Sequence, residues 1–339
     1  CSRSTEAPGV GGRVIVVGAG LSGLCAALLL EERGVEVMLL EARDRLGGRI
    51  QTLDGLPGGP EGGGPVVGGT YQRFSRVAGR LDVPLEPLGG FQREIVFGVG
   101  GRCIPPEQWP ASPHNRLADH EREIPPPALL NHYLDRDNPL EDSSAWAAPR
   151  HSALDIPLDE YLRRQGASDE ALRLINVASN TTDISTTSTL WALRNAQRRR
   201  DSKGGRLITT AGGNSRLAEA MANFIQGPLL KGAPVTAIRS LDDGVEVECA
   251  DGSVHGGEFC VVTVPFSVLR GIQVEPAFEG RQKEAVEGIP YTAITKYFLI
   301  PEAPYWDEDG LPPSMWTDTF IERLFPNRNA AGQIQSITC

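Results

Sequence analysis

Six residues near the N-terminus have the types and spacing of a phosphate-binding turn. They read Gly-Ala-Gly-Leu-Ser-Gly, with glycines at Gly18, Gly20 and Gly23. Glycine at these places allows a tight turn, lets the backbone approach a pyrophosphate and lets a helix pack closely on a strand. The free N–H groups at the start of that helix, which includes Leu21 and Ser22, favour an anion. The spacing therefore predicts a site for the phosphates of a dinucleotide.

An acidic residue follows the turn at the distance that ribose recognition requires. Glu41 lies 18 residues after Gly23, close to the roughly 20 expected for this kind of site. Its carboxylate is suited to accept hydrogen bonds from the hydroxyls of an adenosine ribose. A glycine-rich turn without a ligand has no need of this acid, so the two signals together predict a nucleotide.

A second glycine pair, directly after this acid, distinguishes FAD from NAD. The stretch Glu-Ala-Arg-Asp-Arg-Leu-Gly-Gly-Arg contains Ala42, Arg43, Gly47, Gly48 and Arg49. A site that binds its dinucleotide through the first turn alone does not need this stretch. Two further residues without side chains, Gly47 and Gly48, let the backbone lie against a longer dinucleotide. Arg49 can donate charge-assisted hydrogen bonds to the pyrophosphate. We therefore predict FAD as the cofactor.

The elements that must position these residues are a strand, a helix and a second strand. The apolar run Arg13–Val17 predicts a buried strand, and apolar spacing over Leu21–Arg33 predicts a helix that ends at Gly34. Val35–Leu40 predicts a second buried strand. This order is typical of a parallel sheet in an α/β fold.

Later segments alternate between loop, helix and strand patterns. Residues 53–69 are rich in glycine and proline and predict a loop, and residues 235–264 predict a three-stranded meander with turns at Asp243-Gly244 and Asp251-Gly252. Helices are predicted over Phe74–Leu81, Leu158–Gln165, Asp169–Ala178, Thr189–Arg199 and Ser215–Ile225.

Composition excludes several functions. The 339 residues favour two domains, and a net charge of -10 argues against nucleic-acid binding. The six cysteines form no Cys-x-x-Cys pair, so no metal site is expected. No run of about 20 apolar residues predicts a membrane span. A Gly-x-Ser-x-Gly motif is missing from the sequence, which argues against hydrolase chemistry.

Together, these motifs resemble the flavin-containing amine oxidase family, which includes monoamine, polyamine and L-amino-acid oxidases. The stretch from Val66 to Pro84 is similar to the family's second Gly-Gly segment, which implies that Gly68, Gly69 and Thr70 run past the flavin. The resemblance continues in three later segments. They are Thr210–Ala222, where the chain would return to the FAD domain, Pro234–Ile238, whose Val235 backbone would meet the adenine, and Asp251–Leu269, where Pro265 would end a strand.

One lysine acquires a role only through this resemblance. Lys296 lies in the predicted strand Ala293–Leu299, and on residue type alone a lysine there is more often a solvated side chain. In the family, a strand lysine followed by an aromatic-rich segment holds a water against the flavin N5. Lys296, with Pro304-Tyr305-Trp306 behind it, matches that pattern. The alternation of a strand then turns Thr295 and Tyr297 away from the flavin.

The resemblance also implies a domain plan. A Rossmann-like FAD-binding domain of the GR2 type would comprise residues 12–80 and 203–278. It would be interleaved with an α+β substrate domain of residues 81–202 and 279–339. The family's last segment, which completes the flavin pocket, does not follow within this sequence, so the pocket is expected to be incomplete. The oligomeric state cannot be read from the sequence. The cytoplasm is the expected compartment, with a lipid anchor at Cys1 as an alternative.

The implied reaction is oxidation of a C–N bond. A small amine would lose a hydride to FAD and become an imine, and oxygen would accept the electrons to give hydrogen peroxide. A plain amine is favoured over an amino acid, because the residues around Arg73 do not match the amino-acid-oxidase pattern. L-amino-acid oxidase activity, a desaturase-type flavoprotein and a non-catalytic dinucleotide-binding fragment stay open as alternatives.

Overall fold

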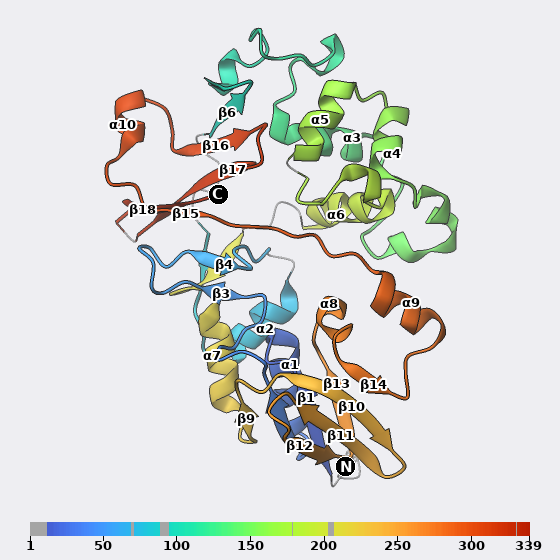
Figure 1. The fold of residues 1–339 in the computed structure, drawn as a ribbon. Coiled ribbons are helices and arrows are strands. Elements are labelled where there is room, and N and C mark those ends of the chain that lie inside the picture. The colour runs from blue at the N-terminus through green and yellow to red at the C-terminus, as the bar shows by residue number, and fades with distance from the viewer. Residues whose placement is uncertain (1–11, 69–70, 89–94, 178, 203–206, 330) are drawn as a thin grey trace, which may run out of the picture.

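The computed structural model describes residues 12–68, 71–88, 95–177, 179–202, 207–329 and 331–339. Figure 1 shows two bodies, one above the other. The described residues within 12–88 and 207–288 form the lower body, and those within 95–202 and 298–339 form the upper body. The chain therefore passes between them more than once. The domain boundaries predicted from the sequence stay a prediction.

A four-stranded parallel sheet is the centre of the lower body. Its strands are ordered β13-β1-β2-β9, with every neighbouring pair parallel. Four of the five residues in each of β1 and β2 are buried, as expected for a parallel sheet covered on both faces. The bounds are β1 Arg13–Val17, β2 Glu36–Leu40, β9 Leu229–Leu230 and β13 Phe259–Val262.

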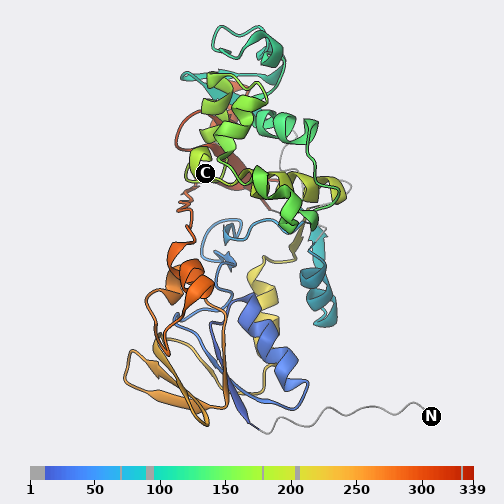
Figure 2. The same ribbon diagram turned by 90° about the vertical axis from the view of Figure 1, so that its right-hand side faces the viewer.

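Helices cover one face of this sheet and a second sheet covers the other, as Figure 2 shows from the side. Val14, Val16, Val37 and Leu39 pack under the helices, and Ile15, Val17, Met38 and Leu40 pack against the second sheet, whose strand order is β12-β11-β10-β14. The bounds are α1 Leu21–Glu31, α2 Gln72–Arg80, α7 Ser215–Phe224, β10 Val235–Leu241, β11 Gly244–Cys249, β12 Val254–Gly257 and β14 Gln273–Glu275.

Residues far apart in sequence meet in the parallel sheet. Strand β13 pairs with β1, from Val14 opposite Phe259 to Val17 opposite Val262, and β9 pairs with β2. Two strands of residues 203–278, β9 and β13, therefore join the sheet of residues 13–50 as predicted, whereas β10, β11, β12 and β14 form the second sheet.

The predicted meander needs two corrections. The predicted third strand is two strands. The first, β12, ends at Gly257 in the second sheet. Glu258 then donates its N–H to the carbonyl of Arg13 (2.8 Å), and β13 begins at the next residue in the parallel sheet. The first turn is Asp242-Asp243, since Leu241 pairs with Gly244. The chain thus changes sheets at one residue.

The loop predicted over residues 53–69 is wrong in part. Residues Glu61–Gly63 form strand β4, which pairs antiparallel with β3, Gln51–Thr52. A second short pair joins β5, Leu85–Pro87, to β8, Ile208–Thr210. Glycine-rich strands carry little sequence signal, and both pairs depend on partners elsewhere in the chain.

The upper body joins a six-stranded sheet, ordered β15-β18-β17-β16-β6-β7, to a group of helices. Their common core includes Phe97, Trp109, Tyr133 and Trp316. The predicted helices are confirmed, with ends that differ by one or two residues. The bounds are β6 Ile95–Val99, β7 Arg102–Ile104, α3 Leu129–Arg136, α4 Leu158–Arg164, α5 Asp169–Val177, α6 Thr189–Asp201, β15 Phe298–Leu299, β16 Ser314–Thr317, β17 Arg323–Arg328 and β18 Ile334–Thr338.

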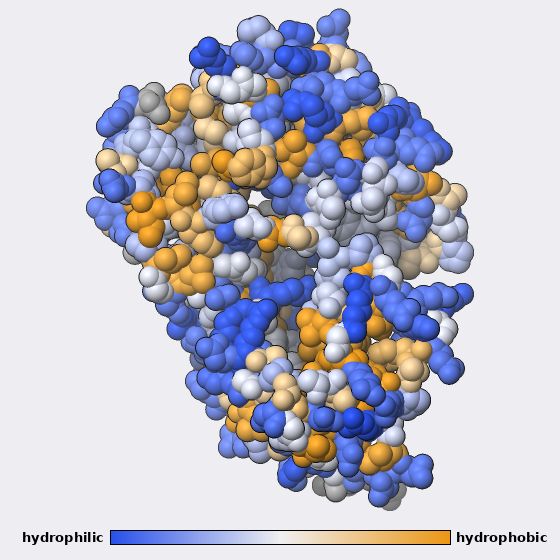
Figure 3. All heavy atoms as spheres, in the orientation of Figure 1, coloured by the Kyte–Doolittle hydropathy of each residue, from blue (hydrophilic) through white to orange (hydrophobic). Residues whose placement is uncertain are grey.

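Short helices complete the chain. Helices α8, Phe266–Leu269, and α9, Gly280–Gly288, pack on each other in the lower body, and α10, Tyr305–Asp309, precedes β16. Six 3₁₀ helices span Pro106–Gln108, Asp119–Glu121, Pro126–Ala128, Ala145–Ala147, Pro149–Leu154 and Ile184–Thr186. None of the helices in the described part of the chain is long and apolar enough to cross a membrane. On the face drawn in Figure 3, hydrophilic residues separate several groups of hydrophobic ones.

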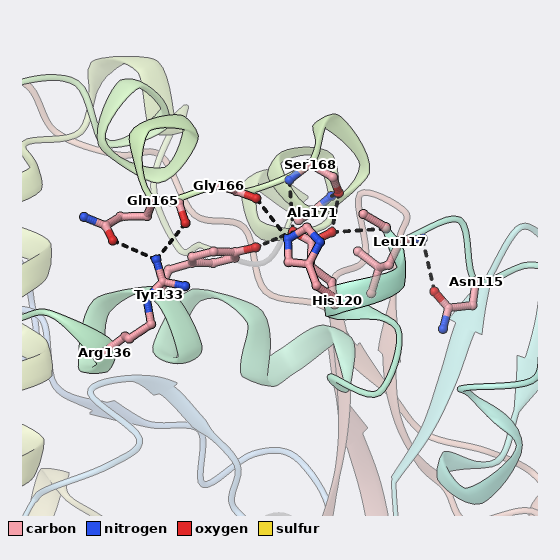
Figure 4. Close-up of polar contacts among 11 residues, drawn as sticks. Asn115, Leu117, His120, Tyr133, Arg136, Gln165, Gly166, Ser168 and Ala171 are labelled. Atoms are coloured by element: carbon pink, nitrogen blue, oxygen red, sulfur yellow. Dashed lines mark hydrogen bonds and ion pairs between the residues drawn. The ribbon is translucent and has the colours of Figure 1, made fainter.

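One buried carboxylate accepts several hydrogen bonds in the interior of the upper body, and Figure 4 labels two of its partners, Tyr133 and Ser168. Glu121 is fully buried and accepts hydrogen bonds from the N–H of Ser168 (2.9 Å), the N–H of Ala118 (3.2 Å), and the hydroxyls of Ser168 and Tyr133. These donors come from the loop before α5, from the 3₁₀ turn of Glu121 itself and from α3. Glu121 therefore ties three separate segments together.

Candidate functional site

The first glycine turn joins β1 to α1. Gly18 has a φ of +101° and donates its N–H to the carbonyl of Leu40 (2.8 Å), which ties the turn to β2. Gly20 precedes α1, and within this described stretch the helix has neither a side-chain cap nor an acidic residue in its first turn. The N–H groups of Leu21 and Ser22 therefore stand at a positive helix end, ready for an anion.

The glycines of this turn are needed for different reasons. A Cβ on Gly23 would lie 1.8 Å from the carbonyl oxygen of Gly18, so a side chain there is excluded by the helix–strand contact. A Cβ on Gly20 would meet only the Cα of Gly48, at 3.9 Å. The space over Gly20 is thus open to a ligand, while the space over Gly23 is filled by the protein.

The second glycine pair lies directly against the first turn. Gly47 donates its N–H to the carbonyl of Ala19 (2.9 Å) and forms a parallel bridge with Gly20. A Cβ on Gly48 would lie 3.1 Å from the Cα of Gly20. Two backbone segments without side chains therefore meet, and they form a cradle that fits the pyrophosphate of an extended dinucleotide.

Arg45 supports this second turn, a role that the sequence did not reveal. Its guanidinium donates to the carbonyls of Gly48 (2.9 Å) and Ile50 (3.3 Å), which fixes the path of the glycine pair. The predicted pyrophosphate donor, Arg49, is exposed at the end of the same turn. In the sequence, the only sign of this role was the position of Arg45 two residues before Gly47. Its guanidinium binds backbone carbonyl groups, and the sequence does not show which carbonyls lie within its reach.

Glu41 lies at the end of β2, buried to 7% exposure, beside the glycine turn. Its Oε2 accepts the N–H of Ala19 (2.8 Å) and its Oε1 accepts the N–H of Arg43 (3.0 Å). Each carboxylate oxygen can accept a further hydrogen bond, so a ribose hydroxyl can be bound by a carboxylate that is already held in place. Ala42 and the side chain of Arg43 are exposed.

The chain also brings Val235 to this corner. Gly232 donates to the carbonyl of Arg43 and Ala233 donates to the carbonyl of Glu41, both at 2.9 Å, and β10 begins at Val235 two residues later. The predicted adenine contact of Val235 is therefore placed next to the predicted ribose contact of Glu41.

Pro265 lies just beyond the edge strand, where it precedes α8. Two residues before it, Thr263 donates its hydroxyl to the carbonyls of Val17 (2.9 Å) and Gly18 (3.0 Å). Thr263 thus anchors the end of β13 to the first glycine turn, a contact that sequence reasoning missed. Gly68 lies further away and accepts the N–H of Tyr71 (2.9 Å), while Gly69 and Thr70 lie outside the described residues.

Lys296 lies between the two bodies, in the segment that leads from α9 to β15. The predicted strand over residues 293–299 is too long. Only Phe298–Leu299 form a strand, and they pair with Thr338 and Ile337 of β18. The predicted alternation holds nonetheless, since Thr295 and Tyr297 are exposed and Lys296 is half-buried. Its Nζ donates to the backbone carbonyl of Glu61 (3.1 Å). Burial lowers the pKa of Lys296, and the charge of Glu61 acts in the opposite direction.

Glu61 is a site residue that the sequence did not reveal. Its Oε1 accepts the N–H of Asn214 (2.6 Å) and the hydroxyl of Thr52 (3.0 Å). Burial raises the pKa of Glu61, while the hydrogen bonds from Asn214 and Thr52 and the charge of Lys296 oppose that rise. The glycine-rich stretch around Glu61 gave no sequence signal for it, and two of its partners, Asn214 and Lys296, lie more than a hundred residues away in sequence.

A short hairpin connects the glycine turns to Lys296. The hairpin β3–β4 starts three residues after Gly48, and Glu61, the first residue of β4, supplies the carbonyl that accepts from Lys296. The phosphate cradle and the lysine are thus connected through one short hairpin. Such an arrangement can bind the adenosine and pyrophosphate half of FAD at one end and present an ammonium group at the other.

Comparison with known proteins agrees with this geometry. A family model described as flavin containing amine oxidoreductase matches residues 21–335. Lysine-specific histone demethylase 1 homolog 3 of Oryza sativa subsp. indica is 28% identical over 308 residues, which cover 87% of this chain and 36% of that protein. Amine oxidase B of Canis lupus familiaris, a flavin-containing protein, is 26% identical over 312 residues, which cover 86% and 58%.

A solved structure shares the fold. Wild-type putrescine oxidase bound to putrescine superposes with a TM-score of 0.75 at 21% identity, over 98% of this chain and 75% of that one. The predicted α/β, FAD-binding fold class is thereby confirmed. The chain spans 36% and 58% of the lengths of the two curated relatives.

Proposed function

Because this chain belongs to the family of flavin-containing amine oxidoreductases, we propose that it binds FAD at the paired glycine turns and serves the oxidation of an amine. The resemblance predicted from the motifs is confirmed by that membership, and FAD is the cofactor that the family implies. The observation that carries the proposal is the contact of Gly20 with the second glycine pair, which leaves a cradle without side chains.

The residues of the cradle divide the work of binding. The N–H groups at the start of α1 and the guanidinium of Arg49 would hold the pyrophosphate, and Glu41 would hold the ribose of the adenosine. Val235 would contact the adenine through its backbone. In this proposal, residues 12–80 and 203–278 carry the cofactor, and residues 81–202 and 279–339 hold the amine.

The proposed chemistry takes two electrons and two protons from the amine. When bound, FAD supplies the acceptor for a hydride that leaves the carbon beside the nitrogen. The amine must be neutral to release that hydride, and the imine that results is hydrolysed by water to a carbonyl compound and a free amine or ammonia. Oxygen is the proposed final acceptor, giving hydrogen peroxide. Lys296 would hold a water through the N–H donors that Glu61 does not use.

The purified protein tests this proposal directly. It should show visible flavin absorbance, and a small monoamine should bleach that absorbance when oxygen is excluded. A full-length protein that carries no flavin and binds NADH tightly would overturn the cofactor assignment. A protein that carries flavin but is not bleached by any amine would overturn the reaction and leave the cofactor site intact.

A pair of alanine variants separates the two uses of glycine in the first turn. Gly20→Ala should fold normally, because its Cβ points into open space, but it should weaken FAD binding at least tenfold, or about 1.4 kcal/mol. Gly23→Ala should instead lower the free energy of unfolding, because its Cβ would overlap the Gly18 carbonyl. Thermal unfolding and FAD titration of both proteins provide the check. Equal losses of stability in the two variants would contradict the assigned roles.

Removing the acid at the end of β2 should weaken the cofactor site. Glu41→Ala should cost roughly 1.5–3 kcal/mol of FAD binding, the range for hydrogen bonds to a charged group. Part of that loss arises because the N–H groups of Ala19 and Arg43 lose their acceptor. Isothermal titration of apoprotein with FAD measures the change, and Glu36→Ala, an exposed acid on the same strand, is the matched control. FAD affinity that is unchanged in Glu41→Ala would remove the residue from the site.

A further inference from the structure

We propose that Glu61 is a positioning residue for Lys296. Its backbone carbonyl holds the ammonium group in place, and its buried carboxylate helps to keep that group positively charged. The proposal rests on the function proposed above only in giving Lys296 a reaction to serve. No motif in the sequence indicates a role for Glu61. The role is inferred from its hydrogen bonds with Asn214, Thr52 and Lys296.

The position of Glu61 is fixed from two sides. Its Oε1 accepts the N–H of Asn214 at the start of α7 and the hydroxyl of Thr52 on β3. Thr52 is itself held by a reciprocal pair of hydrogen bonds with Ser215, at 2.8 and 3.0 Å. Asn214 is fully buried and donates its side-chain amide to the carbonyl of Gly64 (2.8 Å). The carbonyl that accepts from Lys296 therefore belongs to a braced strand and not to a free loop.

The second carboxylate oxygen of Glu61 lacks such support. It is buried, and among the described residues it has no hydrogen-bond partner. A buried acceptor without a partner is costly, and a buried negative charge is more costly still unless a positive charge offsets it. Lys296 is the cation whose charge acts on this carboxylate. The charge of Asp54 acts in the opposite direction and raises the pKa of Glu61, and Asp54 is itself paired with Arg216 at the surface.

The two groups therefore depend on each other for their charges. Burial alone drives the pKa of Lys296 down and the pKa of Glu61 up, so both groups tend toward neutrality. Each charge opposes the shift of the other. When Glu61 is ionised, the ammonium of Lys296 survives to higher pH, and when Glu61 is neutral, Lys296 loses its proton at lower pH.

The small number of lysines makes this coupling measurable without any catalytic assay. The sequence contains four, at 203, 231, 283 and 296. In protein labelled with [ε-¹³C]lysine, the resonance of Lys296 is assigned by its loss in Lys296→Met. In wild-type protein, this resonance should titrate below the usual range of a lysine, because burial lowers the pKa of Lys296. In Glu61→Gln, its midpoint should move to still lower pH.

A matched variant separates this effect from a general change of charge. Asp54→Asn removes one negative charge from the neighbourhood of Glu61 but not from the contact with Lys296, so its shift should be clearly smaller. If the Lys296 midpoint is the same in wild type and Glu61→Gln, or if Asp54→Asn has the larger effect, the proposal is overturned.

A second measurement covers the case in which Glu61→Gln does not fold. In wild-type protein, the Lys296 resonance should show a further inflection at acid pH, as Glu61 takes up its proton. A resonance with a single inflection over the stable range would contradict the coupling. Both titrations are made without amine or oxygen turnover. They can fail while flavin reduction by amines succeeds, and they can succeed while that reaction fails.

Discussion

Replacing Lys296 with methionine should leave FAD bound but slow the reaction of the reduced protein with oxygen about a hundredfold. That change corresponds to about 3 kcal/mol in the barrier. Methionine keeps the approximate length of the side chain and removes its charge and its N–H donors, while the glycine turns proposed to bind the cofactor are a separate part of the lower body. Stopped-flow reoxidation of the reduced full-length protein, wild type against variant, measures the effect.

Another lysine provides the control for that experiment. Lys283 lies on α9 with its side chain 57% exposed, 4.0 Å from Glu287. Lys283→Met changes the net charge by the same amount and should reoxidise at the wild-type rate. If Lys296→Met also reoxidises at that rate, Lys296 has no part in the oxygen reaction and its half-buried position is structural.

Replacing Glu121 with alanine should lower the free energy of unfolding by about 3–5 kcal/mol. The change leaves the hydroxyl of Tyr133, the N–H and hydroxyl of Ser168 and the N–H of Ala118 without their buried acceptor. Each buried donor left unsatisfied costs about 1–3 kcal/mol, and the losses are not fully additive. Urea unfolding at pH 7 measures the effect. Glu123→Ala, at an exposed acid two residues away, should stay within about 0.5 kcal/mol of wild type.

The contribution of Glu121 should also depend on pH. Burial raises the pKa of Glu121, but hydrogen bonds from Ser168, Tyr133 and Ala118 outweigh that effect and bring it below its usual range. A carboxyl group with a depressed pKa stabilises the fold above its unfolded value, about 4.3, and loses that effect as pH falls through the folded value. The stability difference between wild type and Glu121→Gln should therefore shrink as pH falls below about 4. A difference that grows toward acid pH would contradict the sign.

The cofactor half of the site could be predicted because its signals are local. Two buried strands, the helix between them and two glycine turns lie within the first 50 residues. In each case, residue type alone dictates the backbone, as at Gly18 with its positive φ and at Gly23, where no side chain fits. The return of β13 to β1 was predictable only through family resemblance, since pairing across that distance leaves no periodic signal.

The lysine half of the site was harder, because its determinants are distant from one another. The strand expected around Lys296 is mostly irregular chain, since pairing in the described sheet begins only near Phe298. Glu61 lies in a glycine-rich stretch whose pattern does not predict the strand that forms there. The role proposed for Glu61 depends on its contacts with Asn214 and Lys296, which come from two other parts of the sequence. Sequence patterns report which face of an element is buried, but they do not report which distant atoms meet there.

The pairing of β13 with β1 has a consequence for how the protein is made. The strand Arg13–Val17 is synthesised shortly before its partner β2, but its other edge pairs with Phe259–Val262, which is synthesised more than 200 residues later. At about 5–20 residues per second, that edge stays unpaired for roughly 10–50 s, during which the upper-body helices are synthesised and can pack. An open edge of Val and Ile is a template for pairing with other chains. The nascent chain is thus most exposed to misassembly during this interval, which makes residues 14–17 a place where a chaperone would be most useful.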